Sequence, residues 1–154
     1  MRFENKVVMV TGGAAGIGRV TAESFAKEGA RIAICDVNPE AGQAAAKALG
    51  PEASFQQVDV ASSAAVSGWI EGVLDKYGQI AVLVNNAGIT RDGLIMRMKE
   101  EDWDAVISVN LKSAFNCIKA VSKIMVKQRS GRIINLASVV RVMGNPGQAN
   151  YVAS

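Results

Sequence analysis

The stretch that decides the fold is Thr11-Gly12-Gly13-Ala14-Ala15-Gly16-Ile17-Gly18. It directly follows Lys6–Val10, a short run rich in β-branched residues that is typical of a strand, and it opens a segment with helical spacing of apolar residues. Glycines at such a turn let the backbone bend tightly and approach a pyrophosphate, which the N-terminus of the following helix attracts. Asp36 lies 18 residues beyond Gly18, close to the spacing of about 20 that is typical of dinucleotide sites. We therefore predict a dinucleotide site here; the alternative is a glycine turn without a ligand.

The rest of the chain alternates strands with helices. Further strands are predicted at Arg31–Cys35, Ser54–Val58, Ile80–Val84 and Arg132–Leu136. Between them, helices are predicted to begin near Ile17 and at Asn38-Pro39. A third helix carries the apolar stripe Val66–Tyr77, and a fourth covers most of residues 101–128. The runs Val7–Val10 and Val82–Val84 are continuously apolar, as in strands covered on both faces. The pattern predicts one α/β domain over residues 1–154, a doubly wound parallel sheet.

Composition excludes several kinds of chemistry. The chain has no histidine, which rules out Ser-His-Asp catalysis and histidine metal sites. Cys35 and Cys117 lie far apart, so we expect neither a disulfide framework nor a metal site, and a reducing, cytoplasmic location. No apolar run approaches the length of about 18 residues that spans a membrane.

Charge is divided unevenly along the chain. Residues 1–104 carry a net charge of −4 and residues 105–154 carry +7. The basic part includes four lysines that share one helix face, followed by two arginines: Lys112, Lys119, Lys123, Lys127, Arg129 and Arg132. This asymmetry favours an anionic partner, although a solvated basic face is an equal alternative. No nucleic-acid motif accompanies these cations, so we do not expect nucleic acid to be that partner.

Further motifs follow the predicted strands and complete a family pattern. They are Asp59-Val60, Asn85-Asn86-Ala87-Gly88, Asn110 in the long helix, Ser138, and Tyr151. With the Gly-x-x-x-Gly-x-Gly spacing of the first turn, they resemble the short-chain dehydrogenase/reductase family over every residue of the chain. The segments Ile89–Met98 and Gly147–Tyr151 resemble those of the family's 3-oxoacyl-[acyl-carrier-protein] reductases.

The resemblance implies a Rossmann fold with strand order 3-2-1-4-5 and a nicotinamide cofactor. The cofactor-binding residues it implies are Gly12, Ala14, Ala15, Gly16, Ile17, Gly18, Asp36, Val37, Asp59, Val60, Asn86, Ala87 and Gly88. The Asp36 carboxylate can accept two hydrogen bonds from a ribose diol and would repel a 2′-phosphate. No basic residue stands at the positions that NADP-dependent members use, so NAD(H) is favoured and NADP(H) remains possible. A helix cap is the alternative role for Asp36, and also for Asp59.

The resemblance also implies the reaction, which is hydride transfer to a 3-oxoacyl thioester of acyl carrier protein or coenzyme A. Ser138 would stabilise the charge on the carbonyl oxygen, and Tyr151 would supply the proton. Asn110 would bend its helix and order a water of the proton relay, or serve the helix alone. Lys127, Arg129 and Arg132 would dock the acidic carrier. The alternatives are a dehydrogenase of another secondary alcohol, such as a sugar, polyol or 3-hydroxyacid, and a dinucleotide-binding fragment without turnover.

The family pattern continues beyond the sequence in hand. Family members carry a lysine four residues after the tyrosine, which here would follow Ser154, and they have seven strands rather than five. We therefore expect a C-terminally truncated chain that is a poor catalyst by itself, with Arg132–Leu136 as an apolar sheet edge. The full-length form is expected to be a homotetramer.

Overall fold

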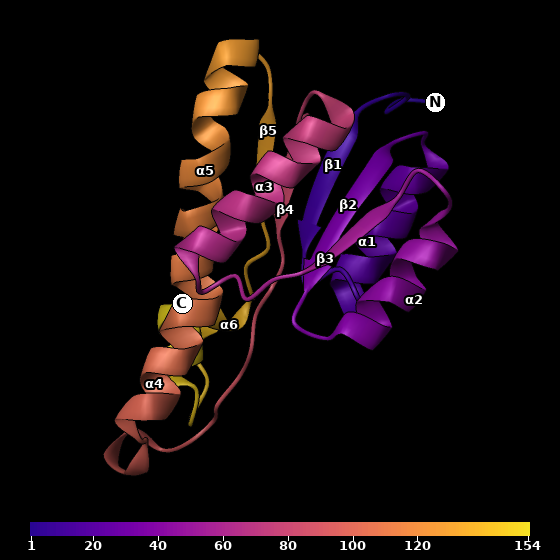
Figure 1. Cartoon of the computed structure of the whole chain (residues 1–154). Coiled ribbons are helices and arrows are strands. Elements are labelled where there is room, and N and C mark those ends of the chain that lie inside the picture. The colour runs from indigo at the N-terminus through magenta and orange to yellow at the C-terminus, as the bar shows by residue number, and fades with distance from the viewer.

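The computed structural model describes all residues 1–154 and contains one parallel sheet of five strands (Figure 1). The strands are β1 (Val7–Thr11), β2 (Arg31–Asp36), β3 (Ser54–Gln57), β4 (Val82–Asn85) and β5 (Arg132–Asn135). Their order is β3-β2-β1-β4-β5, which confirms the predicted topology. In the register, Val8 of β1 pairs with Ile32 on one side and with Val82 on the other.

Helical segments connect the strands, and shorter ones lie in the loops after β4 and β5. They are α1 (Gly16–Lys27), α2 (Pro39–Leu49), α3 (Ser63–Tyr77), the 3-10 turn η1 (Ile95–Arg97), α4 (Glu100–Val106), the π-helical segment η2 (Ile107–Lys112), α5 (Ser113–Gln128), α6 (Val140–Met143) and α7 (Ala149–Ala153). The side chain of Asn38 caps α2 by accepting a hydrogen bond from Ala41 N, as predicted. Gly78 ends α3 in the left-handed conformation.

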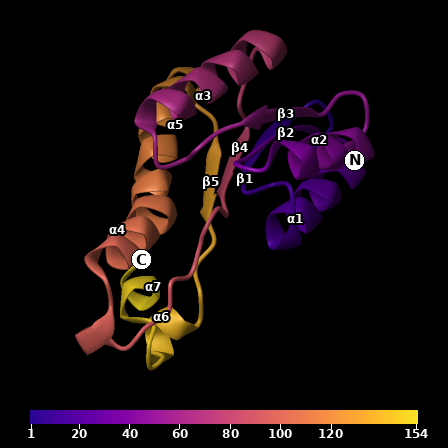
Figure 2. The same ribbon diagram turned by 60° about the horizontal axis from the view of Figure 1, so that its bottom comes forward.

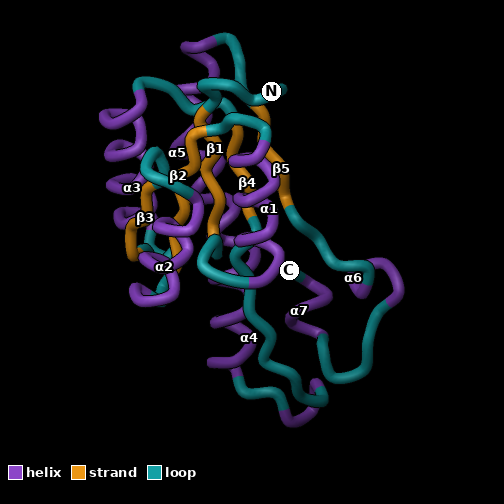
Figure 3. Tube along the Cα trace, turned by 90° about the vertical axis from the view of Figure 1, so that its right-hand side faces the viewer, coloured by secondary structure: helices purple, strands orange, loops and turns teal.

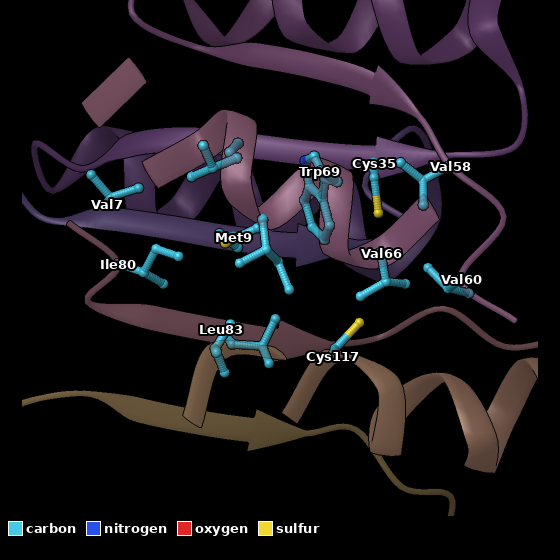
Figure 4. Close-up of a cluster of buried hydrophobic side chains, with 14 of the residues drawn as sticks. Val7, Met9, Cys35, Val58, Val60, Val66, Trp69, Ile80, Leu83 and Cys117 are labelled. Atoms are coloured by element: carbon cyan, nitrogen blue, oxygen red, sulfur yellow. The ribbon is translucent and has the colours of Figure 1, made fainter. Parts of the chain in front are cut away.

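The sheet is covered on both faces, which explains its continuously apolar central strands. Figure 2 shows α1 and α2 on one side of the sheet and α3 and α5 on the other. Alternate residues of β1 therefore enter different cores: Val8 and Val10 face α1 and α2, whereas Val7 and Met9 face α3 and α5. Figure 4 shows Met9 in this second core, where it lies among Trp69, Leu83 and Cys117.

Two segments extend beyond the carboxyl ends of β4 and β5, away from the layered body (Figure 3). One carries η1 and α4, and the other carries α6 and α7. A hydrogen bond from Gly93 N to Gly147 O joins them. The short α6 and α7 were not predicted, because four or five residues are too few to show helical periodicity.

The helix predicted over residues 101–128 is continuous in space but not regular. A π-helical segment, η2, separates α4 from α5 and includes Asn110. Single π turns inside α-helices are uncommon and recur at functional sites. None of the helices has both the length and the apolarity needed to cross a bilayer.

Candidate active site

The glycine turn after β1 has the backbone geometry that only glycine adopts easily. Gly12 and Gly16 have φ angles of +63° and +54°. Gly18 is required for a different reason, because a Cβ there would lie 2.3 Å from the carbonyl oxygen of Gly12. The turn can therefore pack directly against the first turn of α1.

The N-terminus of α1 has no side-chain cap, and its first turn contains no acidic residue. By contrast, Asn38 and Ser62 cap the N-termini of α2 and α3. The backbone N–H groups at the start of α1 thus lack side-chain partners, and a phosphate would satisfy them. This end of α1 fits the pyrophosphate of a dinucleotide.

Asp36 lies at the carboxyl end of β2 and faces the glycine turn. Its Oδ2 accepts a hydrogen bond from Ala14 N at 3.2 Å, and its Oδ1 accepts one from Asn38 N at 3.1 Å. Asn38, not Asp36, is the cap of α2, so the alternative role for Asp36 is wrong. Each carboxylate oxygen has a further lone pair that a ribose hydroxyl could use.

Thr11 fastens the glycine turn to the Asn86–Gly88 segment, a role that sequence reasoning missed. Its buried hydroxyl accepts hydrogen bonds from Asn86 N and Ala87 N, both at 3.0 Å. The Asn86 side chain donates to the carbonyl oxygens of Thr11 and Gly12 at 2.9 and 3.1 Å. The amide of Asn86 therefore holds the turn in place. The position of Thr11 directly before the glycine turn was the sequence feature that could have indicated this role.

Asn110 joins the π-helical segment to the loop after β4. Its Oδ1 accepts from Ile89 N at 2.8 Å, and its Nδ2 donates to Ile89 O at 3.1 Å. The Nδ2 also donates to Ser154 Oγ at 3.0 Å. Asn110 thus holds the backbone that follows Gly88 beside the segment that carries Tyr151.

Ser138 and Tyr151 both lie beyond the carboxyl end of β5, Tyr151 within α7. The Ser138 hydroxyl has one weak contact, as acceptor from Val140 N at 3.4 Å. The phenol hydroxyl of Tyr151 makes no hydrogen bond within the chain, whereas that of Tyr77 donates to Glu52 O at 2.7 Å and also contacts Ser54 Oγ. Of the two tyrosines, only Tyr151 has a hydroxyl that is free for a substrate.

Asn150 anchors the segment that carries Tyr151, and it was not among the predicted residues. It is fully buried, and its Nδ2 donates to Arg91 O at 2.9 Å and to Asp102 O at 3.3 Å. Its Oδ1 accepts from Tyr151 N at 2.8 Å. The partners of Asn150 are mainly main-chain atoms of distant segments, which a sequence pattern does not show.

The three predicted docking cations gather at the other end of the sheet. Lys127 and Arg129 end α5, and Arg132 begins β5; all three are exposed. Gln128 bonds to both Ile80 N and Ile80 O, which places this end of α5 beside the start of β4. The structure therefore brings the cations together but places them away from Ser138 and Tyr151.

The two cysteines contribute to the core rather than to this site. Both are buried in the cluster between the sheet and α3 and α5 (Figure 4). Burial raises the pKa of the Cys117 thiol to about 12 and that of Cys35 well above its ordinary value. No group of three histidine, cysteine or acidic side chains lies close enough to hold a metal ion.

A parallel sheet of this order, with a glycine turn between its central strand and the first helix, defines a Rossmann-type fold. The short chain dehydrogenase family model matches residues 6–154. The chain belongs to this family.

Three similar curated proteins share one name. The 3-oxoacyl-[acyl-carrier-protein] reductase FabG of Chlamydia trachomatis is 50% identical over 97% of this chain, and the protein of that name from Thermotoga maritima is 49% identical over 100%. That of Escherichia coli K12 is 44% identical over 100% of the chain. The chain spans 62%, 64% and 63% of the lengths of these three relatives.

Proposed function

We propose that this chain forms the cofactor-binding part and much of the active site of an enzyme that reduces 3-oxoacyl thioesters of acyl carrier protein or coenzyme A to 3-hydroxyacyl thioesters. The identity of about half to curated reductases of that name carries the proposal. A bound nicotinamide cofactor supplies the hydride. Ser138 donates a hydrogen bond to the substrate carbonyl oxygen as negative charge develops on it, and Tyr151 donates the proton.

The free hydroxyl of Tyr151 gives the sharpest test of this proposal. In the full chain, Tyr151→Phe should lower the rate of acetoacetyl thioester reduction by about 10²–10⁴-fold and leave the unfolding midpoint unchanged. Tyr77→Phe is the matched control, because it removes a hydroxyl that donates a hydrogen bond within the fold. It should lower stability and spare the rate per folded molecule. Equal rates for Tyr151→Phe and the unmodified chain would contradict the proposal.

The same assay separates the alternative functions. Turnover of a sugar, a polyol or a 3-hydroxyacid, without reduction of the thioester, would favour a dehydrogenase of another secondary alcohol. Binding of NADH without turnover of any of these substrates would favour a dinucleotide-binding protein.

We propose NAD(H) as the preferred cofactor. The supporting observation is the Asp36 carboxylate beside Ala14, with the exposed Ala15 and Val37 offering no cation for a 2′-phosphate. NADH should quench the fluorescence of Trp69 or Trp103 at lower concentrations than NADPH. Asp36→Ala should reduce the difference in affinity between NADH and NADPH. Asp59→Ala should weaken the binding of both cofactors equally. Equal affinities in the unmodified chain would contradict the preference.

We also propose that Lys127, Arg129 and Arg132 dock the acidic carrier. Arg129 ends α5 with φ +52°, where the corresponding residue of α3 is Gly78. A non-glycine residue in this conformation costs about 1 kcal/mol. Arg129→Gly should therefore raise stability and raise the KM for a carrier-bound substrate, but leave the KM for a short thioester unchanged. An equal change in both KM values would favour a solvated basic face.

We propose that the full-length protein is a homo-oligomer, which would explain why these cations lie far from Tyr151 of the same copy. Leu111 and Phe115 are 49% and 59% exposed, one turn apart on the helix that leads to the cations. Antiparallel pairing of two such helices would bring the cations of one copy toward Tyr151 of the other. Phe115→Lys should then reduce the hydrodynamic size of the full chain and the rate with carrier-bound substrate together.

A further inference from the structure

Asn116 is a buried amide on the face of α5 that packs against the body of the protein. It is 5% exposed, and its neighbours on that face are the buried Ser113, Cys117 and Val121. An amide in such a place is costly unless its hydrogen-bonding groups have partners. The partners of Asn116 therefore indicate why the helix carries this residue.

Those partners are two consecutive carbonyl groups in the loop between β3 and α3. The Asn116 Nδ2 donates to Val60 O at 3.1 Å and to Ala61 O at 3.2 Å. This loop includes Asp59, whose carboxylate, by the family resemblance, would contact the adenine of the cofactor. Asn116 does not contact that carboxylate, so any effect on it passes through the backbone.

One peptide unit makes the connection. The carbonyl group of Val60 and the N–H group of Ala61 belong to the same planar unit and point in opposite directions. The carbonyl accepts from Asn116, and the N–H donates to Asp59 Oδ1 at 2.9 Å. If this unit rotated, both hydrogen bonds would be lost together. The other oxygen of Asp59 makes no hydrogen bond within the chain and is free to accept one.

We propose that Asn116 is a positioning residue for recognition of the adenine base, acting through the Val60–Ala61 peptide unit on the Asp59 carboxylate. The inference rests on the proposed function. A correctly oriented Asp59 can accept a hydrogen bond from the 6-amino group of adenine. Hypoxanthine carries a carbonyl oxygen at that position, which the carboxylate repels.

The test compares the dissociation constants of NADH and of its hypoxanthine analogue, measured with the full chain. The unmodified protein should bind NADH about tenfold more tightly, the scale of one hydrogen bond to a charged acceptor. Asn116→Leu should reduce this ratio to about one. Gln128→Leu is the matched control, since it also removes an amide of α5 that bonds to main-chain atoms, those of Ile80, but at the other end of the sheet. It should keep the tenfold ratio.

The ratio is insensitive to a general loss of stability, because both ligands are measured on the same folded protein. Asn116→Ala leaves room for water at the two carbonyl groups, so it preserves folding better, and it should reduce the ratio in the same direction. A tenfold ratio retained in both Asn116 variants would overturn the inference and leave the proposed function standing. Equal dissociation constants for the two ligands in the unmodified protein would show that Asp59 does not distinguish adenine from hypoxanthine. That result would overturn the inference as well. Failure to bind either ligand would overturn the proposed function itself.

Discussion

Strands β1 and β5 both carry consecutive apolar residues but have opposite surroundings. Every residue of β1 is buried, whereas every residue of β5 is exposed, with Ile133 at 37% and Ile134 at 43%. β1 has a neighbouring strand on each side, and β5 has only β4. The burial of an apolar strand therefore depends on the strands beside it.

Two isoleucines provide the strongest test, because β2, like β1, has a neighbouring strand on each side. Ile34 in β2 is fully buried and Ile134 in β5 is not. Ile34→Ala should lower the free energy of unfolding by about 2–5 kcal/mol through lost burial and the cavity that remains. Ile134→Ala should lower it by about 1 kcal/mol or less. Denaturant unfolding measures both changes. Equal losses, together with an increased molecular size, would show that association covers β5 in solution.

Two hydroxyl groups sharpen the comparison further. Thr11→Val at the end of β1 leaves two N–H groups without their acceptor, so it should cost about 1–3 kcal/mol of stability. Ser138→Ala removes only a weak contact after β5 and should change stability by less than about 0.5 kcal/mol, although it should slow thioester reduction strongly. If Ser138→Ala lost stability and kept its activity, the proposed catalytic role would be wrong.

The effect that is smallest at neutral pH concerns the buried thiols. Burial raises the pKa of Cys117 from 9.0 to about 12. The unfolded thiol therefore loses its proton first as pH rises, and this favours the unfolded chain. Its contribution to stability is complete below pH 9 and declines as pH rises toward 12. Cys117→Ala should flatten the alkaline decline in the unfolding midpoint. Native Cys117 should also resist thiol reagents at neutral pH, and rapid labelling would contradict its burial.

The apolar runs between turn residues predicted all five strands to within two residues. The strand order was implied by the family resemblance, and the structure confirms it. The start of α2 at Asn38-Pro39 was also predicted correctly, since helix caps are local. The π-helical segment was missed, because it coincides with bonds between Asn110 and a distant loop. Thr11, Asn116 and Asn150 were missed for the same reason, since their partners are mainly main-chain atoms far along the chain.

The placement of β1 between β2 and β4 also has a consequence for the order of folding. Val8 must meet Ile32 across a short loop and Val82 across a loop about three times longer, whose closure costs about 1 kcal/mol more in entropy. Pairing of β1 with β2 should therefore precede docking of β4. Thr11 obtains its partners Asn86 and Ala87 only in that later step. During refolding, recovery of NADH binding should lag behind recovery of the far-ultraviolet circular dichroism signal.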